Sequence, residues 1–242
     1  MRTLVIVPVY REGRKVGKVL ERFEPGFVDE ICIVIDNPDS KILGEIGEAA
    51  NRVRVPVSIV QNPERSGIGH AIKQGYHYAL GHGFELIVVM AGNGKDDPIE
   101  VPRVTRPILR EGYDYVQGSR FLPGGRIERN PLLRRIFTRL FPFLWTWMVG
   151  VRCTDVTNGF RAYRATILQD PRINVWQHWL DGYELEYYLH YKTLTLGYRF
   201  TERPVSKTYP RERRGGYTKI SPLRDWWQIV GPLLLLRLGA RR

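Results

Sequence analysis

The feature that most constrains the fold is an alternation of short apolar runs with longer amphipathic segments in the first half of the chain. Runs rich in β-branched residues, typical of buried strands, occupy residues 3–9, 30–36, 55–61 and 84–90, with a shorter one at 113–116. Segments with helical spacing separate them at residues 14–23, 40–52, 68–80 and 99–111. This order predicts an α/β fold with a mostly parallel, Rossmann-like sheet flanked by helices.

The second half of the chain is less regular. A helix is predicted at residues 182–196 and a strand at 198–206, after a polar, turn-like stretch at 155–163. Residues 207–219 are basic and contain glycine, which is typical of a loop. Fewer strands and helices can therefore be predicted here than in the first half.

Two apolar blocks with interspersed arginines lie at residues 130–151 and 222–242. Both are too short and too charged to cross a bilayer, and Trp combined with Arg is typical of segments that lie in the headgroup region. We expect peripheral membrane contact through both blocks, the second as an amphipathic helix at 222–238. Packing on the domain, or in a dimer interface, stays open as the alternative.

The chain of 242 residues carries a net charge of +12, and the positive charge is unevenly spread. Residues 101–164 contain 12 Lys or Arg against 4 Asp or Glu, and residues 203–242 contain 10 against 2. Such basic regions indicate a polyanionic partner: nucleic acid, anionic lipid or substrate phosphates. No recognised nucleic-acid motif is present, so nucleic acid is not the predicted partner. Two cysteines exclude a disulfide scaffold and a four-thiolate zinc site.

Polar residues follow the first two predicted strands, at the edge where parallel sheets bind ligands. Tyr10 and Glu12 follow the first strand, where they can stack on a nucleobase and accept hydrogen bonds from a base or ribose. Asp36 ends the second strand, a place where a carboxylate often receives ribose or base N–H groups. The alternatives are an ordinary loop for Tyr10 and Glu12 and a helix N-cap for Asp36.

Glycines follow the third predicted strand and acidic residues follow the fourth. Gly67 and Gly69 permit close approach of the backbone to a ligand, and the helix that begins there favours anions. The alternative is a glycine turn that closes against the helix, since the pattern is neither a Rossmann nor a Walker A loop. Asp96 and Asp97 lie where a metal–diphosphate complex would bind, although either is suited to be a helix N-cap before Pro98.

These motifs occur in the order found in one enzyme family. P-V-Y-R-E-G, V-I-D-N, G-I-G-H-A and M-A-G-N-G-K-D-D-P are followed by G-S-R, D-V-T-N-G-F-R, Y-E-L-E and E-R-P-V. Over residues 3–220 the series resembles the family 2 glycosyltransferases with a GT-A fold, and among them the dolichol-phosphate mannosyltransferases and related polyprenyl-phosphate sugar transferases. The resemblance implies a glycosyltransferase domain at residues 1–220 and a membrane-interface helix at 221–242.

The resemblance implies a nucleotide-binding role for ten residues. They are Pro8, Tyr10, Glu12, Asp36, Gly67, Ala91, Gly92, Asn93, Lys95 and Arg211. The chain departs from the family at the metal-binding D-x-D motif and the following glutamine, where Ala91, Asn93 and Lys95 stand instead. Three explanations stay open. Asp96 and Asp97, with Asn93, hold a weakly bound Mg²⁺ or Mn²⁺; Lys95 partly replaces the metal; or the chain is an inactive relative.

The resemblance also implies an acceptor site in the second half of the chain. The residues that would hold an acceptor phosphate are Arg120, Arg134, Thr138 and Lys219. A phosphate acceptor is already an anion at neutral pH and needs no strong base. A sugar hydroxyl needs a general base, for which Asp181 and Glu184 are the candidates.

The function that follows is an inverting transfer of a hexose from a nucleotide sugar to a polyprenyl or dolichyl phosphate at a membrane surface. We expect mannose from GDP-mannose first and glucose from UDP-glucose next. The alternatives are a transferase to a glycan hydroxyl and a non-catalytic module that binds nucleotide sugars. The N-terminal apolar run is too short for a signal peptide, so a peripheral protein at the cytoplasmic face is expected; the oligomeric state stays open.

Overall fold

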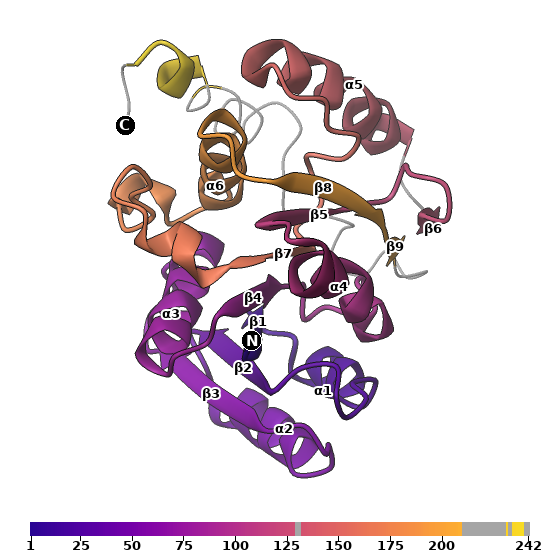
Figure 1. Cartoon of the computed structure of the whole chain (residues 1–242). Helices are drawn as coiled ribbons and strands as arrows, with labels where there is room; N and C mark the ends of the chain where they lie inside the picture. Colours follow the sequence, from indigo (N-terminus) through magenta and orange to yellow (C-terminus); the bar gives the residue numbers. More distant parts are fainter. Residues whose placement is uncertain (129–131, 210–230, 232–233, 240–242) are drawn as a thin grey trace.

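The computed structural model describes residues 1–128, 132–209, 231 and 234–239, with residues 132–137 described by their backbone alone. Strands and helices alternate through the first half, as predicted (Figure 1). They are β1 (Thr3–Val9), α1 (Gly13–Leu20), β2 (Glu30–Asp36), α2 (Ser40–Ala50), β3 (Val57–Asn62), α3 (Ile68–Gly81), β4 (Leu86–Val89), η1 (Pro98–Glu100), α4 (Val101–Glu111) and β5 (Tyr115–Ser119). The second half holds β6 (Arg126–Glu128), α5 (Leu132–Val149), β7 (Arg161–Arg164), η2 (Ala165–Gln169), η3 (His178–Leu180), α6 (Glu184–Thr195), β8 (Phe200–Pro204) and β9 (Ser206–Thr208).

Seven strands form one mixed sheet in the order β3-β2-β1-β4-β7-β5-β8. All neighbouring pairs are parallel except the two that involve β7, which runs antiparallel to β4 and β5. The predicted mostly parallel α/β sheet is therefore confirmed. The expectation of a turn throughout 155–163 is wrong at its end, because Arg161 already pairs with both neighbours of β7.

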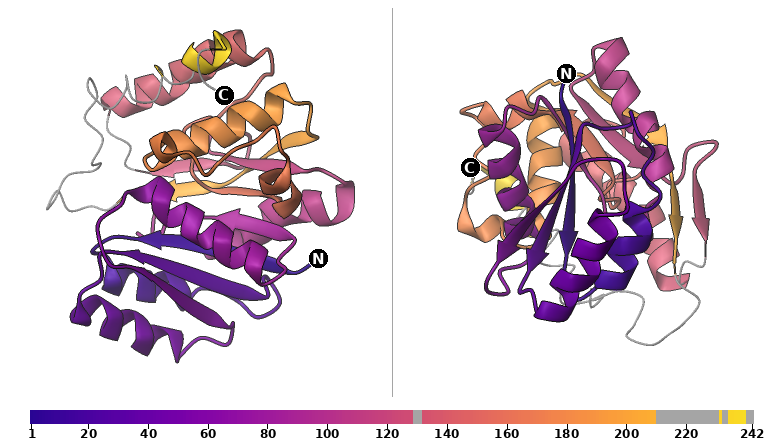
Figure 2. Two further views of the ribbon diagram at one scale, coloured as in Figure 1. Left: turned by 90° about the vertical axis from the view of Figure 1, so that its left-hand side faces the viewer. Right: turned by 90° about the horizontal axis from the view of Figure 1, so that it is seen from below.

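The sheet separates two hydrophobic cores, and helices lie on both of its sides (Figure 2). Leu4 and Ile6 of β1 face a core that includes α3, α5 and α6, whereas Val5 and Val7 face a core built with α1, α2 and α4. Because both faces are covered, the central strands are apolar throughout rather than alternating. This explains why the first half could be predicted from its apolar runs.

The predicted strand at 198–206 is divided into two strands with different partners. Strand β8 ends at Pro204, which has no N–H to continue the ladder, and β9 pairs in parallel with β6 in a separate two-stranded sheet. Between them, Val205 donates its N–H to Ser119 O. The change of partner brings β9 beside the segment after β4, where the Thr208 N–H donates to Lys95 O at 3.0 Å.

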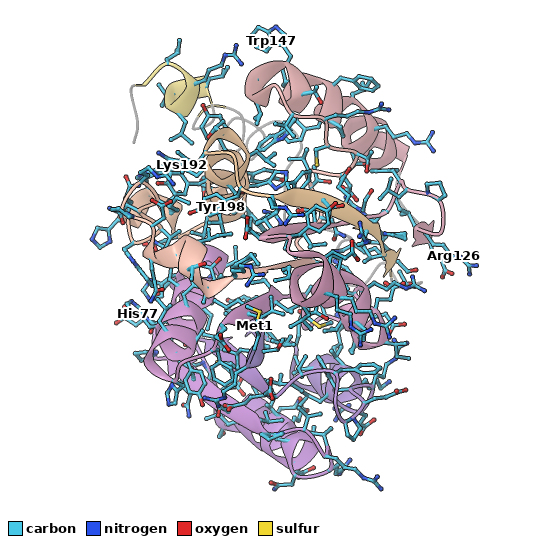
Figure 3. All side chains as sticks on the ribbon, in the orientation of Figure 1. Met1, His77, Arg126, Trp147, Lys192 and Tyr198 are labelled. Carbon is cyan, nitrogen blue, oxygen red and sulfur yellow. The ribbon has the colours of Figure 1, made fainter. Side chains whose placement is uncertain are left out.

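Helix α5 has one apolar face in contact with solvent. Its exposed large side chains are Leu140, Phe143, Leu144 and Trp147. Their spacing places them on one side of the helix, while Phe141 and Trp145 are buried in the core. Trp147 is 67 % exposed and points away from the body of the protein (Figure 3).

Part of the C-terminal segment packs beside the end of α5 (Figures 1 and 2). Arg237 donates to Trp147 O at 2.9 Å, and its guanidinium lies 5.0 Å from the centre of the Trp147 ring. Leu236 is buried, whereas Leu238 is 78 % exposed. Within the described part of the chain, no helix combines the length and the apolar character that crossing a membrane requires.

Candidate active site

The ends of four parallel strands and the beginning of one antiparallel strand meet at one edge of the sheet. The register pairs Asp36 at the end of β2 with Asn62 at the end of β3. Arg161 at the beginning of β7 pairs with Val89 at the end of β4 and with Gln117 of β5. The loops after β1, β2, β3 and β4 and the segment before β7 therefore come together, as expected for a ligand site in an open α/β sheet.

Asp36 organises the loop that follows β3. Its Oδ1 accepts from the Ser66 N–H at 2.9 Å and its Oδ2 from the Gly67 N–H at 3.2 Å. Each carboxylate oxygen has two acceptor positions, so Asp36 retains capacity for a ligand N–H. Asn62 lies next to it, equally buried, and its Nδ2 has no hydrogen-bond partner within the described residues. An acceptor beside an unpaired donor suits the edge of a nucleobase. Asn62 follows a predicted strand, but as an amide it was not counted among the predicted site residues.

Tyr10, after β1, has two guanidinium groups close to its ring. The Arg11 and Arg65 guanidinium carbons are 5.2 and 5.0 Å from the centre of its ring. Arg11 has a φ of 55° and Asn37, after β2, a φ of 54°. Left-handed backbone costs a non-glycine residue about 1 kcal/mol or more and is concentrated at ligand sites. These two positions therefore support the hypothesis that a ligand binds at this edge, Arg11 more than Asn37, because asparagine adopts this conformation readily.

The remaining predicted nucleoside residues lie on the same side of the sheet. Pro8 is the next-to-last residue of β1 and pairs with Val34 of β2. Glu12 immediately precedes α1, and its carboxylate is 3.6 Å from Lys15 Nζ. The structure thus brings Pro8, Tyr10 and Glu12 to the edge that also holds Asp36.

Gly67 and Gly69 pack against backbone carbonyls rather than leaving the end of α3 open. A Cβ at Gly67, whose φ is +102°, would lie 2.5 Å from Asp181 O. A Cβ at Gly69 would also overlap the backbone of this segment, and the His70 N–H donates to Asp181 O at 3.1 Å. Two amides expected to favour an anion, those of Gly67 and His70, are therefore already paired with Asp36 and Asp181. The glycine-turn alternative describes this loop better.

Asp181, whose carbonyl oxygen contacts the glycine loop, forms an ion pair with a buried lysine. Lys73 Nζ lies 2.7 Å from Asp181 Oδ1 and also donates to Gln177 O at 2.7 Å. His70 Nδ1 is 3.6 Å from the same carboxylate oxygen. The Asp181 side chain is 30 % exposed, so it can meet a ligand from one side. Glu184 begins α6 three residues later, so both candidate bases border the site.

The segment after β4 folds back on itself through its acidic residues. Asp96 Oδ2 accepts from the Ala91 N–H at 2.9 Å, and Asp96 is 1 % exposed. Asp97 caps η1 by accepting from the Ile99 N–H, and its other oxygen is 2.6 Å from Arg22 Nη2. The N-cap alternative for Asp97 is thus confirmed. Gly92 leaves no room for a side chain, because a Cβ there would lie 2.9 Å from Val7.

This donor set does not fit a divalent metal. Within the part of the chain that the structure describes, no group of three or more His, Cys, Asp or Glu side chains could hold a metal ion. Asn93 Oδ1 accepts from the Lys95 N–H at 3.2 Å, and Asp96 Oδ1 lies 2.9 Å from Lys207 Nζ. A backbone amide and a lysine ammonium thus compete with a cation for these oxygens. That Asn93 and Asp96 hold a metal stays a prediction.

Arg120 has a different role from the predicted one. Its side chain is fully buried, with Nε 2.6 Å from Asp155 Oδ2 and Nη2 2.6 Å from Asp155 Oδ1. Burial opposes the charged form, but the ion pair and hydrogen bonds with Asp155 outweigh it and raise the pKa of Arg120. A guanidinium with no exposed surface meets no acceptor phosphate. Arg120 instead fixes the segment before β7 to the end of β5.

The other predicted acceptor residues, and Arg211, which is predicted to bind the diphosphate, belong to α5 or follow β9 in the sequence. Thr138 is buried in α5, and Arg134 belongs to the same helix, with only its backbone described. Arg211 and Lys219 lie outside the described residues. Lys207, like Asn62, is absent from the sequence-based prediction of the site. It precedes them in the basic stretch and offered no signal beyond its charge.

The comparisons with known proteins agree with this geometry. The family model described as Glycosyl transferase family 2 matches residues 4–170. An undecaprenyl-phosphate mannosyltransferase of Micrococcus luteus is 28 % identical, over 91 % of this chain and 88 % of that protein. A polyprenol monophosphomannose synthase of Mycolicibacterium smegmatis is 27 % identical, over 91 % of this chain and 81 % of that protein.

A solved structure shares the fold. Glucosyl-3-phosphoglycerate synthase from Mycobacterium tuberculosis, crystallised with Mn²⁺, UDP and phosphoglyceric acid, superimposes with a TM-score of 0.69 and 18 % identity. The match covers 98 % of this chain and 78 % of that chain. At this identity the likeness concerns the GT-A fold alone. The family match covers more than half of the chain, and with the shared fold it leads to one conclusion: the chain belongs to glycosyl transferase family 2 and is a nucleotide-sugar-dependent glycosyltransferase.

Proposed function

We propose that the chain transfers a hexose from a nucleotide sugar to a polyprenyl phosphate, with inversion at the anomeric carbon. The observation that carries this proposal is that the two relatives described above, an undecaprenyl-phosphate mannosyltransferase and a polyprenol monophosphomannose synthase, each align with 91 % of the chain. GDP-mannose is the first donor to test and UDP-glucose the second.

The proposed reaction needs a bound donor and an anionic acceptor on opposite sides of the sugar. The nucleoside binds to Tyr10, Asp36 and Asn62. A phosphate oxygen of the acceptor attacks the anomeric carbon as the bond to the nucleoside diphosphate breaks, and the diphosphate leaves with that electron pair. Cationic groups stabilise the charge that develops on the leaving diphosphate.

An anionic acceptor makes a general base unnecessary in this proposal. A phosphate monoester carries about −1.5 to −2 charge at neutral pH. The Asp181 carboxylate then positions Lys73 through the 2.7 Å contact described above, its carbonyl oxygen holds the glycine loop, and it deprotonates nothing. Arg134, Arg211 and Lys219 are proposed to form the phosphate sites, whereas Thr138 is as buried as Arg120. Glu184 is the second candidate base if the acceptor is a hydroxyl.

We further propose that the protein binds a membrane surface peripherally. The exposed face of α5 and the C-terminal leucines lie side by side, with Arg237 between them. Apolar side chains bordered by arginine suit the headgroup region of an anionic bilayer. The division at residues 220 and 221 and the cytoplasmic face stay predictions.

The test follows labelled sugar. The full chain is incubated with polyprenyl phosphate in detergent and with GDP-mannose or UDP-glucose carrying a labelled hexose, and the products are extracted into organic solvent. The proposal expects acid-labile label in the organic phase from one donor, and the Asp181→Asn variant should retain turnover within about tenfold. Label only in a water-soluble glycan, lost in Asp181→Asn, would support the hydroxyl alternative. Nucleotide binding without turnover would support the non-catalytic alternative.

A further inference from the structure

Strand β9 is fixed to the segment after β4 by contacts at three consecutive residues. Glu100 Oε2 accepts from the Ser206 N–H at 2.6 Å, and Glu100 Oε1 accepts from the Ser206 hydroxyl at 3.0 Å. Two residues later, the Thr208 N–H donates to Lys95 O. Lys207, between them, is therefore held by backbone and side-chain contacts on both sides, and its position is built into the fold.

The Lys207 ammonium is enclosed by two oxygens. Its Nζ lies 2.9 Å from Asp96 Oδ1 and donates to Asn158 Oδ1 at 2.9 Å. Asn158 is itself anchored, since its Nδ2 donates to Gly118 O at 3.0 Å. The Asp96 side chain is fully buried, and the Lys207 side chain is 10 % exposed. A lysine is rarely buried to this degree without a charged partner.

The ion pair lies beside the position where the family carries a metal-binding carboxylate. Asp96 Oδ2 accepts from the N–H of Ala91, which stands at the first place of the D-x-D motif. Asp96 Oδ2 is thus paired with the backbone of that position, while Oδ1, which accepts no hydrogen bond within the described residues, lies at ion-pair distance from the Lys207 ammonium. A divalent cation that approached Asp96 would have to displace an amine held at ion-pair distance.

The charges near this loop balance without a metal. Asp96 is paired with Lys207, and Asp97 is paired with Arg22 at 2.6 Å. Each of these two aspartates therefore has its own counter-cation, and Lys95 Nζ lies 5.4 Å from the centre of the Tyr209 ring. Two aspartates with neither counter-cations nor a metal ion would instead repel a diphosphate.

We propose that the Asp96–Lys207 ion pair takes the place of the divalent metal, so that this chain binds a nucleoside diphosphate without a metal ion. The inference rests on the proposed function for its ligand. Lys207 is a fixed counter-cation that cancels the charge of Asp96 at the diphosphate end of the site. Asp96 is a positioning residue for Lys207 and for the Ala91 backbone.

The first experiment uses the unaltered full chain. Binding of UDP and of GDP is measured by calorimetry in buffer with a chelator and in buffer with Mn²⁺, and Mn²⁺ binding alone is followed by electron paramagnetic resonance. The proposal expects dissociation constants that agree within about twofold between the two buffers. Binding that appears only with Mn²⁺ would overturn it while leaving the proposed function intact. No binding of either nucleotide in either buffer would overturn both.

The second experiment separates an electrostatic role from a merely structural one. Lys207→Met keeps the length of the side chain and leaves the Asp96 carboxylate uncompensated, so binding in chelator should weaken about tenfold or more and Mn²⁺ should restore part of it. Asp96→Asn can still accept from Ala91 and leaves Lys207 positive, so binding should be unchanged or tighter. Lys41→Met, on the exposed side of α2, is the control.

Lys207→Met and Asp96→Asn should change the dissociation constant in opposite directions only if the role of the ion pair is electrostatic. Thermal unfolding of each variant establishes that it is folded before binding is compared. Equal weakening in Lys207→Met and Asp96→Asn would show a structural pair and would overturn the proposal. Failure of Mn²⁺ to restore binding to folded Lys207→Met would also count against it.

Discussion

Arg120 and Asp155 form an ion pair with neither side chain exposed to solvent, Nε to Oδ2 being 2.6 Å. Asp155→Asn would leave the guanidinium buried without its counter-charge. We expect the free energy of unfolding to fall by about 3–5 kcal/mol, measured by urea denaturation. The segment before β7 should also lose protection from hydrogen exchange, because Asp155 accepts from the Arg120 N–H as well.

The matched control for this change is Asp114→Asn. Arg164 Nε lies 3.2 Å from Asp114 Oδ1, but both side chains are more than a quarter exposed. Partly solvated pairs contribute little, so we expect a loss below about 1 kcal/mol. Equal losses for the two variants would contradict the assignment of a buried pair to Arg120.

Stability should depend on pH through His190. Burial, followed by the nearby Arg161, lowers the pKa of His190 well below its ordinary value, so it is neutral in the folded protein. In the unfolded chain it takes up a proton below about pH 6.5. The contribution of neutral His190 to the free energy of unfolding is therefore fully present above that pH. It is lost as the pH falls, by at most about 1.4 kcal/mol per pH unit.

The measurement compares urea denaturation of the unaltered chain and His190→Leu across this pH range. Other histidines and carboxylates contribute equally to both proteins, so the difference isolates His190. The variant should show the shallower loss of stability on acidification. Parallel pH profiles would exclude a buried neutral His190 as a source of acid sensitivity.

Nucleotide affinity should depend on the pair of residues at the ends of β2 and β3. Asp36→Ala removes acceptors and releases the loop that they hold, and should weaken UDP or GDP binding by about 1–3 kcal/mol. Asn62→Ala should weaken binding without releasing the loop, because its Nδ2 holds no described residue. Glu64→Ala, which is exposed in the same loop, is the control. An unchanged dissociation constant in Asp36→Ala would remove it from the site.

Membrane binding should depend on the exposed face of α5. Phe143→Ser with Trp147→Ser removes two large exposed apolar side chains and should reduce binding to anionic liposomes about tenfold or more in a sedimentation assay. High salt should weaken binding but not abolish it, because salt screens the arginines and leaves the apolar contact. Leu109→Ser, at an exposed position on α4, should have no effect. Equal binding by all three proteins would leave the membrane proposal without support.

The fold of the first half could be predicted because its central strands, β1, β2 and β4, are buried on both faces. Strand β7 could not, since Arg161-Ala162-Tyr163-Arg164 has no apolar run and is buried by its neighbours instead. The Arg161 guanidinium is satisfied by carbonyl oxygens, those of Val156 and Asn158 among them, and by Glu186 at 4.0 Å. Such compensation arises from residues distant in the sequence and leaves no local pattern.

The candidate site shows the same limit for charged residues. The position of Asp36 after a strand identifies it, because the carboxyl edge of a parallel sheet is set by topology. The sequence identifies Arg120 and Lys207 as cations. It does not show whether the counter-ion of each is a ligand or an internal carboxylate. In this fold both counter-ions, Asp155 and Asp96, are internal.

The reversal of β7 also decides where the chain tolerates a change in length. Because β7 runs against its neighbours, the connection that enters it lies at the ligand edge, while the connection that leaves it lies at the far edge. There, Arg164 donates its N–H to Asp114 O and Ala165 to Glu85 O. Insertions in the turns at 82–85 and 112–114 are therefore remote from the chemistry, whereas one extra residue between Asp155 and Arg161 would shift Asn158 and with it the support of Lys207.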